Sequence, residues 1–307
     1  MRSTQRTGAS VLERAFSLLE VLGSDGESVG LTELARRARL PKATTHRLAN
    51  QLIELRLLEH SGDGYQLGIK LFELGHGVAR QRKLREAALP FMEDLYEATH
   101  ETIHLGVLDG IEVLYLEKIS GRRACGVSTT VGTRKPLYCT ALGKAILAFS
   151  SRPLLDAVIQ RGLPARTPYT ITTPERLQKE LRRTAETGVA YDREEHQLGI
   201  TCVASTLLGN AGPARAAISV TGPTTRFRPD RCAAAVRTAA LGLTRALGWL
   251  TSPFYSPARP AKWVHALCSD AGRPFFAAAA CRSASDSVLT GPPRLVAAIV
   301  IRAFCAR

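Results

Sequence analysis

The sequence predicts an α+β protein, with a small and mainly helical N-terminal domain followed by a larger domain that combines strands and helices. Apolar residues recur at helical spacing from Val11 to Leu55. Beyond residue 100, alternating apolar runs typical of strands are interspersed with short helical segments. A chain of 307 residues, of which 45% are hydrophobic and 22% charged, is long enough for two cores. We expect domains over residues 1–78 and 79–249, and an atypical extension over 250–307.

The N-terminal domain is predicted to begin with two helices. Ser10 and Glu13 have capping-box spacing, so the first helix should start between them. Its apolar stripe comprises Val11, Ala15, Leu18 and Leu22. Gly23 is the expected C-terminal residue of this helix. Thr32 is expected to cap a short second helix that runs through Ala38.

A third helix and a hairpin are predicted to complete this domain. Pro41 suits the first position of the helix, and Leu48, Leu52 and Leu55 should face inward. The stretch "LLEHSGDGYQLG" then indicates two short strands joined around Gly62-Asp63-Gly64. Helix, short helix, tight turn, helix and hairpin is the order of a winged helix-turn-helix, whose third helix enters the major groove of DNA.

The segment Leu34–Leu52 contains five arginine and lysine residues and His46, but no carboxylate. An ordinary solvated helix face would usually include Glu four residues from Lys or Arg. A surface that meets phosphate excludes acids, and the net charge of +14 also favours an anionic partner. We therefore predict binding to double-stranded DNA. The candidate contacts are Arg14, Arg36, Lys42, Thr44, Thr45, His46 and Arg47, which we expect to lie largely off the buried stripe.

The second domain is predicted to have a sheet flanked by helices. Residues 69–100 should be helical on both sides of a polar connector, "RQRKLR". Strands are expected on both sides of Asp109-Gly110 and in "ITCVASTLL" and "ARAAISVTG". Helices are expected over Thr140–Phe149 and Pro153–Arg161, and from Pro174 to Thr187 with Gly188 just after the end.

The seven cysteines form no CxxC pair and no Cys/His metal-binding spacing, so we expect free thiols and neither metal nor cofactor. Asp192, His196 and Cys202 are nevertheless the ingredients of a thiol nucleophile with its base. A thiol-dependent enzyme that uses Cys202 and carries a fused DNA-binding domain is therefore the alternative hypothesis. It leaves the N-terminal domain unexplained, and a nucleoid-type DNA binder without a ligand would leave the second domain unexplained.

Several ordered segments of the chain resemble the isocitrate-lyase-regulator (IclR) family of bacterial transcription factors. They are "VLERAFSLLEVL", "LTELARRARLPKATTHRLANQL", "GYQLGIKLFELG", "TALGKAILA", "GVAYDREEHQLGITCVA" and "AAISVTGP", between Val11 and Gly248. The resemblance implies a GAF-like effector-binding domain and assembly as a homodimer or homotetramer. The chain departs from the family pattern at Arg39, where glycine is usual in a turn, and at Ser205, where proline is usual.

The resemblance also implies a site for a small effector, which we expect to be an organic or aromatic acid. Its residues here would be Thr140, Ala141, Asp192, Cys202, Ser219 and Thr221. A helix N-terminus at Thr140 and Ala141 would offer backbone N–H groups to a carboxylate. Ser219 and Thr221 alternate along one strand, so both hydroxyls should face the same side. Without the resemblance, these would be read as ordinary strand residues and Cys202 as a small buried hydrophobe.

These observations predict a ligand-responsive transcriptional regulator that is not an enzyme. No apolar segment is long enough to span a bilayer, so we expect a cytoplasmic protein with no membrane partner. Beyond Gly248 the composition changes, with three of the seven cysteines, both tryptophans and only two acids. We expect this extension to be disordered or poorly packed.

Overall fold

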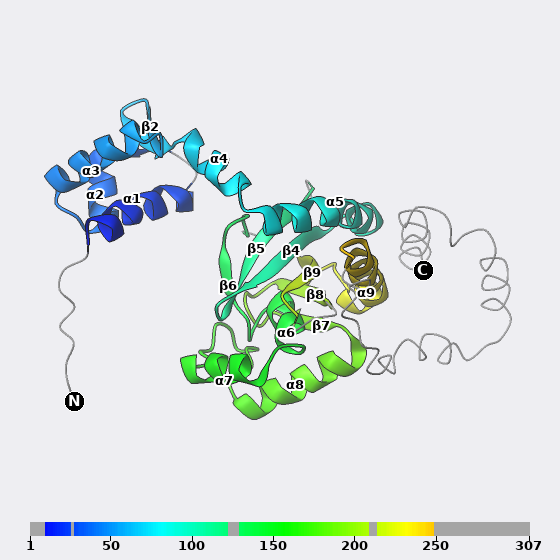
Figure 1. The fold of residues 1–307 in the computed structure, drawn as a ribbon. Helices are drawn as coiled ribbons and strands as arrows, with labels where there is room; N and C mark the ends of the chain where they lie inside the picture. The colour runs from blue at the N-terminus through cyan, green and yellow to red at the C-terminus, as the bar shows by residue number, and fades with distance from the viewer. Residues whose placement is uncertain (1–9, 26–27, 122–128, 209–213, 249–307) are drawn as a thin grey trace, which may run out of the picture. The chain divides into compact units, whose positions relative to one another are not determined.

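The computed structural model describes residues 10–25, 28–121, 129–208 and 214–248 (Figure 1). The chain divides into two compact units, Met1–Arg82 and Lys83–Arg307. The extension expected over 250–307 lies outside the described residues, as does Cys125.

The N-terminal unit is a winged helix-turn-helix, as the sequence predicts. Its elements are α1 (Val11–Asp25), β1 (Val29–Gly30), α2 (Leu31–Ala38), α3 (Lys42–Glu54), β2 (Leu58–Ser61), β3 (Gly64–Leu67) and α4 (Ile69–His76). The three strands pair antiparallel in the order β1-β3-β2. Leu18, Leu34 and Leu48 are fully or almost fully buried where α1, α2 and α3 meet, and they anchor the core.

The start of α1 confirms the predicted capping box. The backbone N–H of Glu13 donates to Ser10 Oγ at 3.1 Å, and the backbone N–H of Ser10 donates to Glu13 Oε2 at 2.7 Å. The predicted end at Gly23 is wrong, because α1 continues to Asp25. Val11 is half exposed and not part of the buried stripe.

The boundaries around the recognition helix also differ from the prediction. Thr32 lies inside α2, which begins at Leu31, and Pro41 precedes α3 as its N-cap residue. Leu55 ends α3 and is 63% exposed, so it does not face the core. The family's usual glycine in the turn between α2 and α3 is replaced here by Arg39. Arg39 adopts a left-handed conformation with φ of 55°, which lets the backbone turn between α2 and α3.

The second unit is built on a six-stranded antiparallel sheet in the order β6-β5-β4-β9-β8-β7. Its strands are β4 (Thr102–Asp109), β5 (Glu112–Ile119), β6 (Arg134–Pro136), β7 (Ala190–Arg193), β8 (Ile200–Leu207) and β9 (Ala216–Pro223). Its helices are α5 (Ala79–Thr99), α6 (Ala141–Leu147), α7 (Arg152–Arg161), α8 (Pro174–Thr187) and α9 (Pro229–Ala246). The predicted hairpin, the three helices between 140 and 187 and both closing strands are confirmed.

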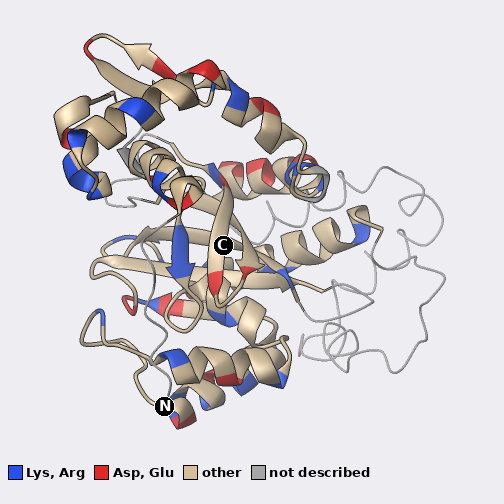
Figure 2. Cartoon of the chain, turned by 60° about the vertical axis from the view of Figure 1, so that its left-hand side comes forward, with Lys and Arg blue, Asp and Glu red and all other residues tan. Residues whose placement is uncertain are grey.

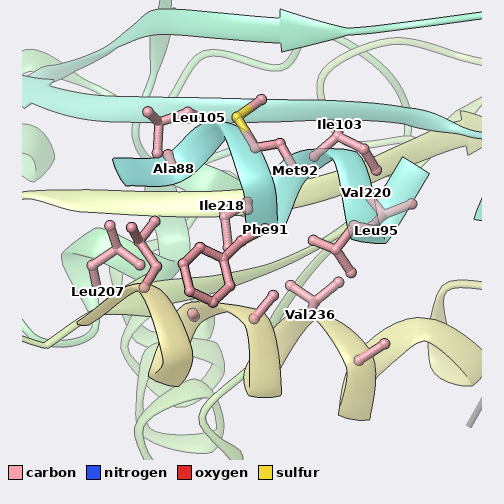
Figure 3. Packing of buried hydrophobic residues seen from close by; sticks show 14 of the residues in the cluster. Ala88, Phe91, Met92, Leu95, Ile103, Leu105, Leu207, Ile218, Val220 and Val236 are labelled. Carbon is pink, nitrogen blue, oxygen red and sulfur yellow. The ribbon is translucent and has the colours of Figure 1, made fainter. Parts of the chain in front are cut away.

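The two faces of this sheet differ in character. On one face α5 and α9 pack side chains such as Phe91, Leu95 and Val236 against Ile103 and Val220 (Figure 3). On the other face α6 packs together with Val113, Ala204 and Ala217, and α8 packs against α6. The segment "RQRKLR" is not a connector, since it lies within the first turns of α5. Polar residues of the α6 face line a cavity.

Candidate functional site

The N-terminal half of α3 is the strongest candidate surface for a polyanion. Lys42, His46 and Arg47 are exposed, Thr44 is half-buried, and α3 has no acid before Glu54. Within the described residues, these three basic side chains have no hydrogen bond or ion pair. Lys and Arg occur on helices of both units, with acids among them, so total charge alone does not mark this surface (Figure 2).

The remaining predicted DNA contacts already make hydrogen bonds within the protein. Arg36 donates to both carboxylate oxygens of Glu33, which also accepts from Arg37. These contacts lower the pKa of Glu33 to about 2. Arg14 is half-buried and its Nε lies 3.4 Å from the carbonyl oxygen of Ser10. The prediction for Thr45 is wrong.

Thr45 belongs to the core of the N-terminal unit. Its exposed fraction is 0%, and its hydroxyl donates to the carbonyl oxygen of Pro41 at 3.2 Å. The helical period places position 45 one turn before Ala49 and three residues before Leu48, both of which are buried. A side chain on this stripe cannot contact DNA unless the helix unfolds.

A cavity of about 30 Å³ lies on the α6 face of the larger sheet. Its lining includes every residue predicted for the effector: Thr140, Ala141, Asp192, Cys202, Ser219 and Thr221. It also includes residues that were not predicted for the effector: His104, Tyr115, Thr129, Leu142, His196, Gln197 and Ile200.

The strand register brings the predicted residues together. Asp192 on β7 pairs with Cys202 on β8, and Cys202 pairs with Thr221 on β9, so the three form a row across the sheet. Ser219 stands two residues before Thr221 and faces the same side. Thr140 caps α6 by accepting the N–H of Gly143 at 3.1 Å, which fixes the start of the helix at the cavity.

Asp192 is the acid of the cavity lining, and it is 4% exposed. Its Oδ1 accepts the backbone N–H of Glu195 at 2.8 Å and of His196 at 3.4 Å. Burial raises the pKa of Asp192 to about 7, although Lys144 and these hydrogen bonds oppose the shift. Burial also lowers the pKa of His196 to about 4. The lining contains no lysine or arginine. Because of its lowered pKa, the imidazole of His196 is neutral at pH 7.

A buried ion pair fixes the loop that follows Asp192. Lys144 of α6 is fully buried and pairs with Glu195, while Glu180 of α8 lies 3.9 Å from the same ammonium group. The hydroxyl of Thr170 donates to the carbonyl oxygen of Glu195 at 2.6 Å. Separating the two charges of a buried pair costs free energy, because each would be left without its partner. We therefore expect α6 and this loop to move together.

The thiol-enzyme hypothesis requires Cys202 to be activated by His196. The sulfur of Cys202 instead accepts the hydroxyl of Thr221 at 3.2 Å, and the Nδ1 of His196 lies 3.7 Å from Cys139 Sγ. Burial raises the pKa of the Cys202 thiol well above its ordinary value, so the thiolate is scarce at neutral pH. Among the described residues, no group of three His, Cys, Asp or Glu side chains could hold a metal ion.

Comparison with known proteins agrees with this architecture. The model described as "Bacterial transcriptional regulator IclR C-terminal" matches residues 76–245, and the "IclR helix-turn-helix domain" model matches residues 11–62. The chain belongs to the IclR family. It is a ligand-responsive transcriptional regulator with a DNA-binding helix-turn-helix domain and a C-terminal effector-binding domain, and members of this family are not enzymes.

Its relatives include regulators from Escherichia coli K12. KdgR is 33% identical over 256 residues, which are 81% of this chain and 97% of KdgR, and XynR is 32% identical over 244 residues, 78% and 97% of the two chains. Among solved structures, an IclR homolog from Microbacterium hydrocarbonoxydans complexed with 4-hydroxybenzoate is 29% identical, with a TM-score of 0.72 over 78% of this chain and 99% of that one. Thermotoga maritima IclR is 30% identical, with a TM-score of 0.66 over 77% and 98%. In the described part of this chain, no helix has the length and hydrophobicity to cross a bilayer.

Proposed function

We propose that this regulator contacts operator DNA through the N-terminal half of α3. Lys42, Thr44, His46 and Arg47 are the expected contacts, with Arg14 and Arg36 as flanking phosphate contacts. The support is that the basic residues of this half-helix are exposed and have no competing acid. Recognition helices present their first turns to base edges and phosphates.

We propose that the cavity on the α6 face binds a small organic acid. Asp192, Cys202, Ser219 and Thr221 line it together with Thr140 and Ala141, and this convergence is the observation that carries the proposal. The first turn of α6 leaves backbone N–H groups without helical acceptors, which suits a carboxylate. The complex of a homolog with 4-hydroxybenzoate supports an aromatic monocarboxylic acid as one candidate.

We propose that the chain works as a homodimer or homotetramer with domains at 1–78 and 79–249. None of the apolar residues of α4 is buried, and Phe72 is 70% exposed. Leu12 and Phe16 of α1 are 81% and 61% exposed. Exposed apolar helix faces mark contacts with other protein surfaces, and a second copy would match a palindromic operator. Because the chromosome of a bacterium is in its cytoplasm, we place the protein there.

Effector binding would act on DNA binding by favouring one arrangement of the paired domains. The effector can shift this equilibrium only as far as its affinity differs between the two arrangements. A ligand at 100 times its Kd stabilises the protein by about 2.7 kcal/mol, so thermal shift with small organic and aromatic acids would identify candidates.

The test is a titration of Ser219→Ala and Asp192→Ala with the acid so identified, with and without operator DNA. Loss of the Ser219 hydroxyl should weaken binding by about 0.5–1.5 kcal/mol for a neutral partner or about 1.5–3 for a carboxylate. This is roughly a twofold to hundredfold loss. Ser205→Ala is the matched control, because Ser205 is buried on β8 and donates to Gly188 O at 2.8 Å outside the cavity lining. If both cavity variants bind as the parent does, the effector site is elsewhere.

A further inference from the structure

His104 is a buried polar residue of the cavity that has no part in the proposed effector contacts. It lies in the middle of β4, paired with Lys118 on β5 and with Ser219 on β9, and it is 2% exposed. Its ring meets Tyr115 edge-on, with centroids 5.0 Å apart and planes at 86°. Both residues line the cavity. Among the described residues, its Nε2 is buried and has no hydrogen-bond partner.

The hydrogen bonds around His104 determine what Nε2 can do. The hydroxyl of Thr221 donates its single proton to Cys202 Sγ at 3.2 Å. The same oxygen lies 3.3 Å from His104 Nδ1. With its proton on the sulfur it accepts from Nδ1–H, and this is the tautomer that we assign to His104. Burial lowers the pKa of His104 to about 3, so the ring is neutral at pH 7. In this tautomer Nε2 carries no proton and can only accept a hydrogen bond.

We infer that His104 Nε2 accepts a hydrogen bond from a hydroxyl group of the effector, so that the cavity selects a hydroxylated carboxylic acid over its counterpart without the hydroxyl. This inference rests on the proposed effector site. A buried acceptor without a partner costs free energy, and a ligand that supplies the donor removes that cost. Sites built to bind a hydroxyl discriminate against analogues that lack it. A second carboxylate would meet the acceptor Nε2 and the acid Asp192, and the lining has no lysine or arginine to balance its charge.

Three variants separate this role from packing. His104→Asn keeps an amide near the position of Nδ1, beside Thr221, but has no group at the position of Nε2. His104→Gln carries an amide out to about the position of Nε2. Asp192→Asn tests the carboxylate of the lining, a strong acceptor that could otherwise explain a preference for a hydroxyl. Thermal unfolding of each variant identifies any that fails to fold.

The experiment measures affinities by calorimetry for matched acids: 4-hydroxybenzoate with benzoate, and lactate with propionate. The full-length protein should prefer the hydroxylated member of at least one pair by about three- to tenfold. His104→Asn should lose this preference while it binds the acid without the hydroxyl within about twofold of the parent. His104→Gln should retain it, and so should Asp192→Asn.

Each other outcome is decisive. A preference that survives in His104→Asn, or that is lost only in Asp192→Asn, assigns the hydroxyl to another residue and overturns the inference. If the parent protein binds these acids without any preference, the inference fails while the proposed effector site stands. If none of the four acids binds, the inference fails, whereas the proposed acid-binding function is decided separately by the acid that thermal shift identifies. If His104→Asn unfolds, His104→Leu takes its place. The inference is then supported if the preference for the hydroxylated acid is retained in His104→Gln and lost in His104→Leu, and it is overturned if His104→Leu keeps the preference.

Discussion

Glu33 accepts two hydrogen bonds from Arg36, at 2.8 and 2.6 Å, within the helix that precedes the recognition helix. The acid-free segment of the sequence therefore begins one residue after an acid that partly neutralises its first two arginines. Exposed pairs of this kind contribute little to stability and can exchange for a phosphate. Lys42 and Arg47 have no such competitor in the described structure, so charge is most available at the start of α3.

Lys42→Ala and Arg47→Ala should weaken binding to operator DNA and leave the melting temperature nearly unchanged. Both side chains are exposed, so their removal costs little packing. Each lost phosphate contact should reduce the slope of log Kobs against log salt by about 0.9. Fluorescence anisotropy with a duplex selected from a random library, at several salt concentrations, measures both quantities.

Arg36→Ala and Thr45→Val are the comparisons for this experiment. Arg36→Ala should have a smaller effect than Arg47→Ala, because Glu33 competes for the guanidinium. Thr45→Val should leave DNA affinity unchanged, since Thr45 is fully buried. Equal binding by the parent, Lys42→Ala and Arg47→Ala would place the DNA contacts on another surface.

Phe72→Ser should weaken self-association. A phenylalanine that becomes buried against a second copy contributes about 1.5–3 kcal/mol, so its loss should raise the dimer dissociation constant by roughly tenfold to a hundredfold. Tyr169→Ser is the matched control, because Tyr169 is 58% exposed and lies in the second unit. Sedimentation equilibrium distinguishes the two variants. Unchanged association of Phe72→Ser would exclude this face of α4 from the interface.

The elements that the sequence predicts best carry signals within a few residues of one another. Ser10 and Glu13 set the start of α1, and Gly188, with φ of 76°, ends α8 as expected. The errors arise where tertiary packing decides. Thr45 is polar, yet it occupies the buried side of α3, and β6 and β7 are too short for a pattern to show. The connector predicted in "RQRKLR" is helical because α5 packs along the sheet.

The effector site is predicted from the family motifs more than from chemistry. Asp192, Cys202 and Thr221 converge through strand register, since Asp192 pairs with Cys202 and Cys202 pairs with Thr221. This register depends on pairing between separate strands, which no local pattern in the sequence shows. His104 is the residue of this site for which the sequence does hold a local signal. It alternates with Ile103 and Leu105, which face the apolar core, so the side chain of His104 must lie on the opposite face of the strand.

Cys202 should react slowly with iodoacetamide at neutral pH. Burial raises the pKa of its thiol, and the thiolate is the reactive form. Mass spectrometry of the labelled peptide over time, with the parent compared with Cys202→Ser, measures the rate. Labelling within seconds at pH 7 would restore the thiol-enzyme hypothesis. An added acid that binds in the cavity should slow the labelling of Cys202 further if it covers the sulfur.

Asp192 should make the protein less stable as pH rises from about 4 to about 7. Its pKa is near 3.8 in an unfolded chain and about 7 in the folded protein. Below this window the carboxyl is protonated in both states. Within the window only the folded state keeps the proton, so the free energy of unfolding falls as pH rises, and above it the loss is complete. The shift corresponds to about 4 kcal/mol at most.

Asp192→Asn should therefore flatten this dependence. An asparagine oxygen can still accept the backbone N–H groups of Glu195 and His196, so the loop should keep its shape. His196, whose lowered pKa makes stability rise with pH over about 4–6.5, is present in both proteins, and its contribution cancels in the difference. Urea unfolding at pH 5, 6, 7 and 8 measures the free energy of unfolding of both proteins. The value for Asp192→Asn minus that for the parent should increase steadily up to pH 7 and then stay constant. A difference that stays constant from pH 5 to 8 would mean that Asp192 is ionised throughout, with its charge balanced in the folded protein.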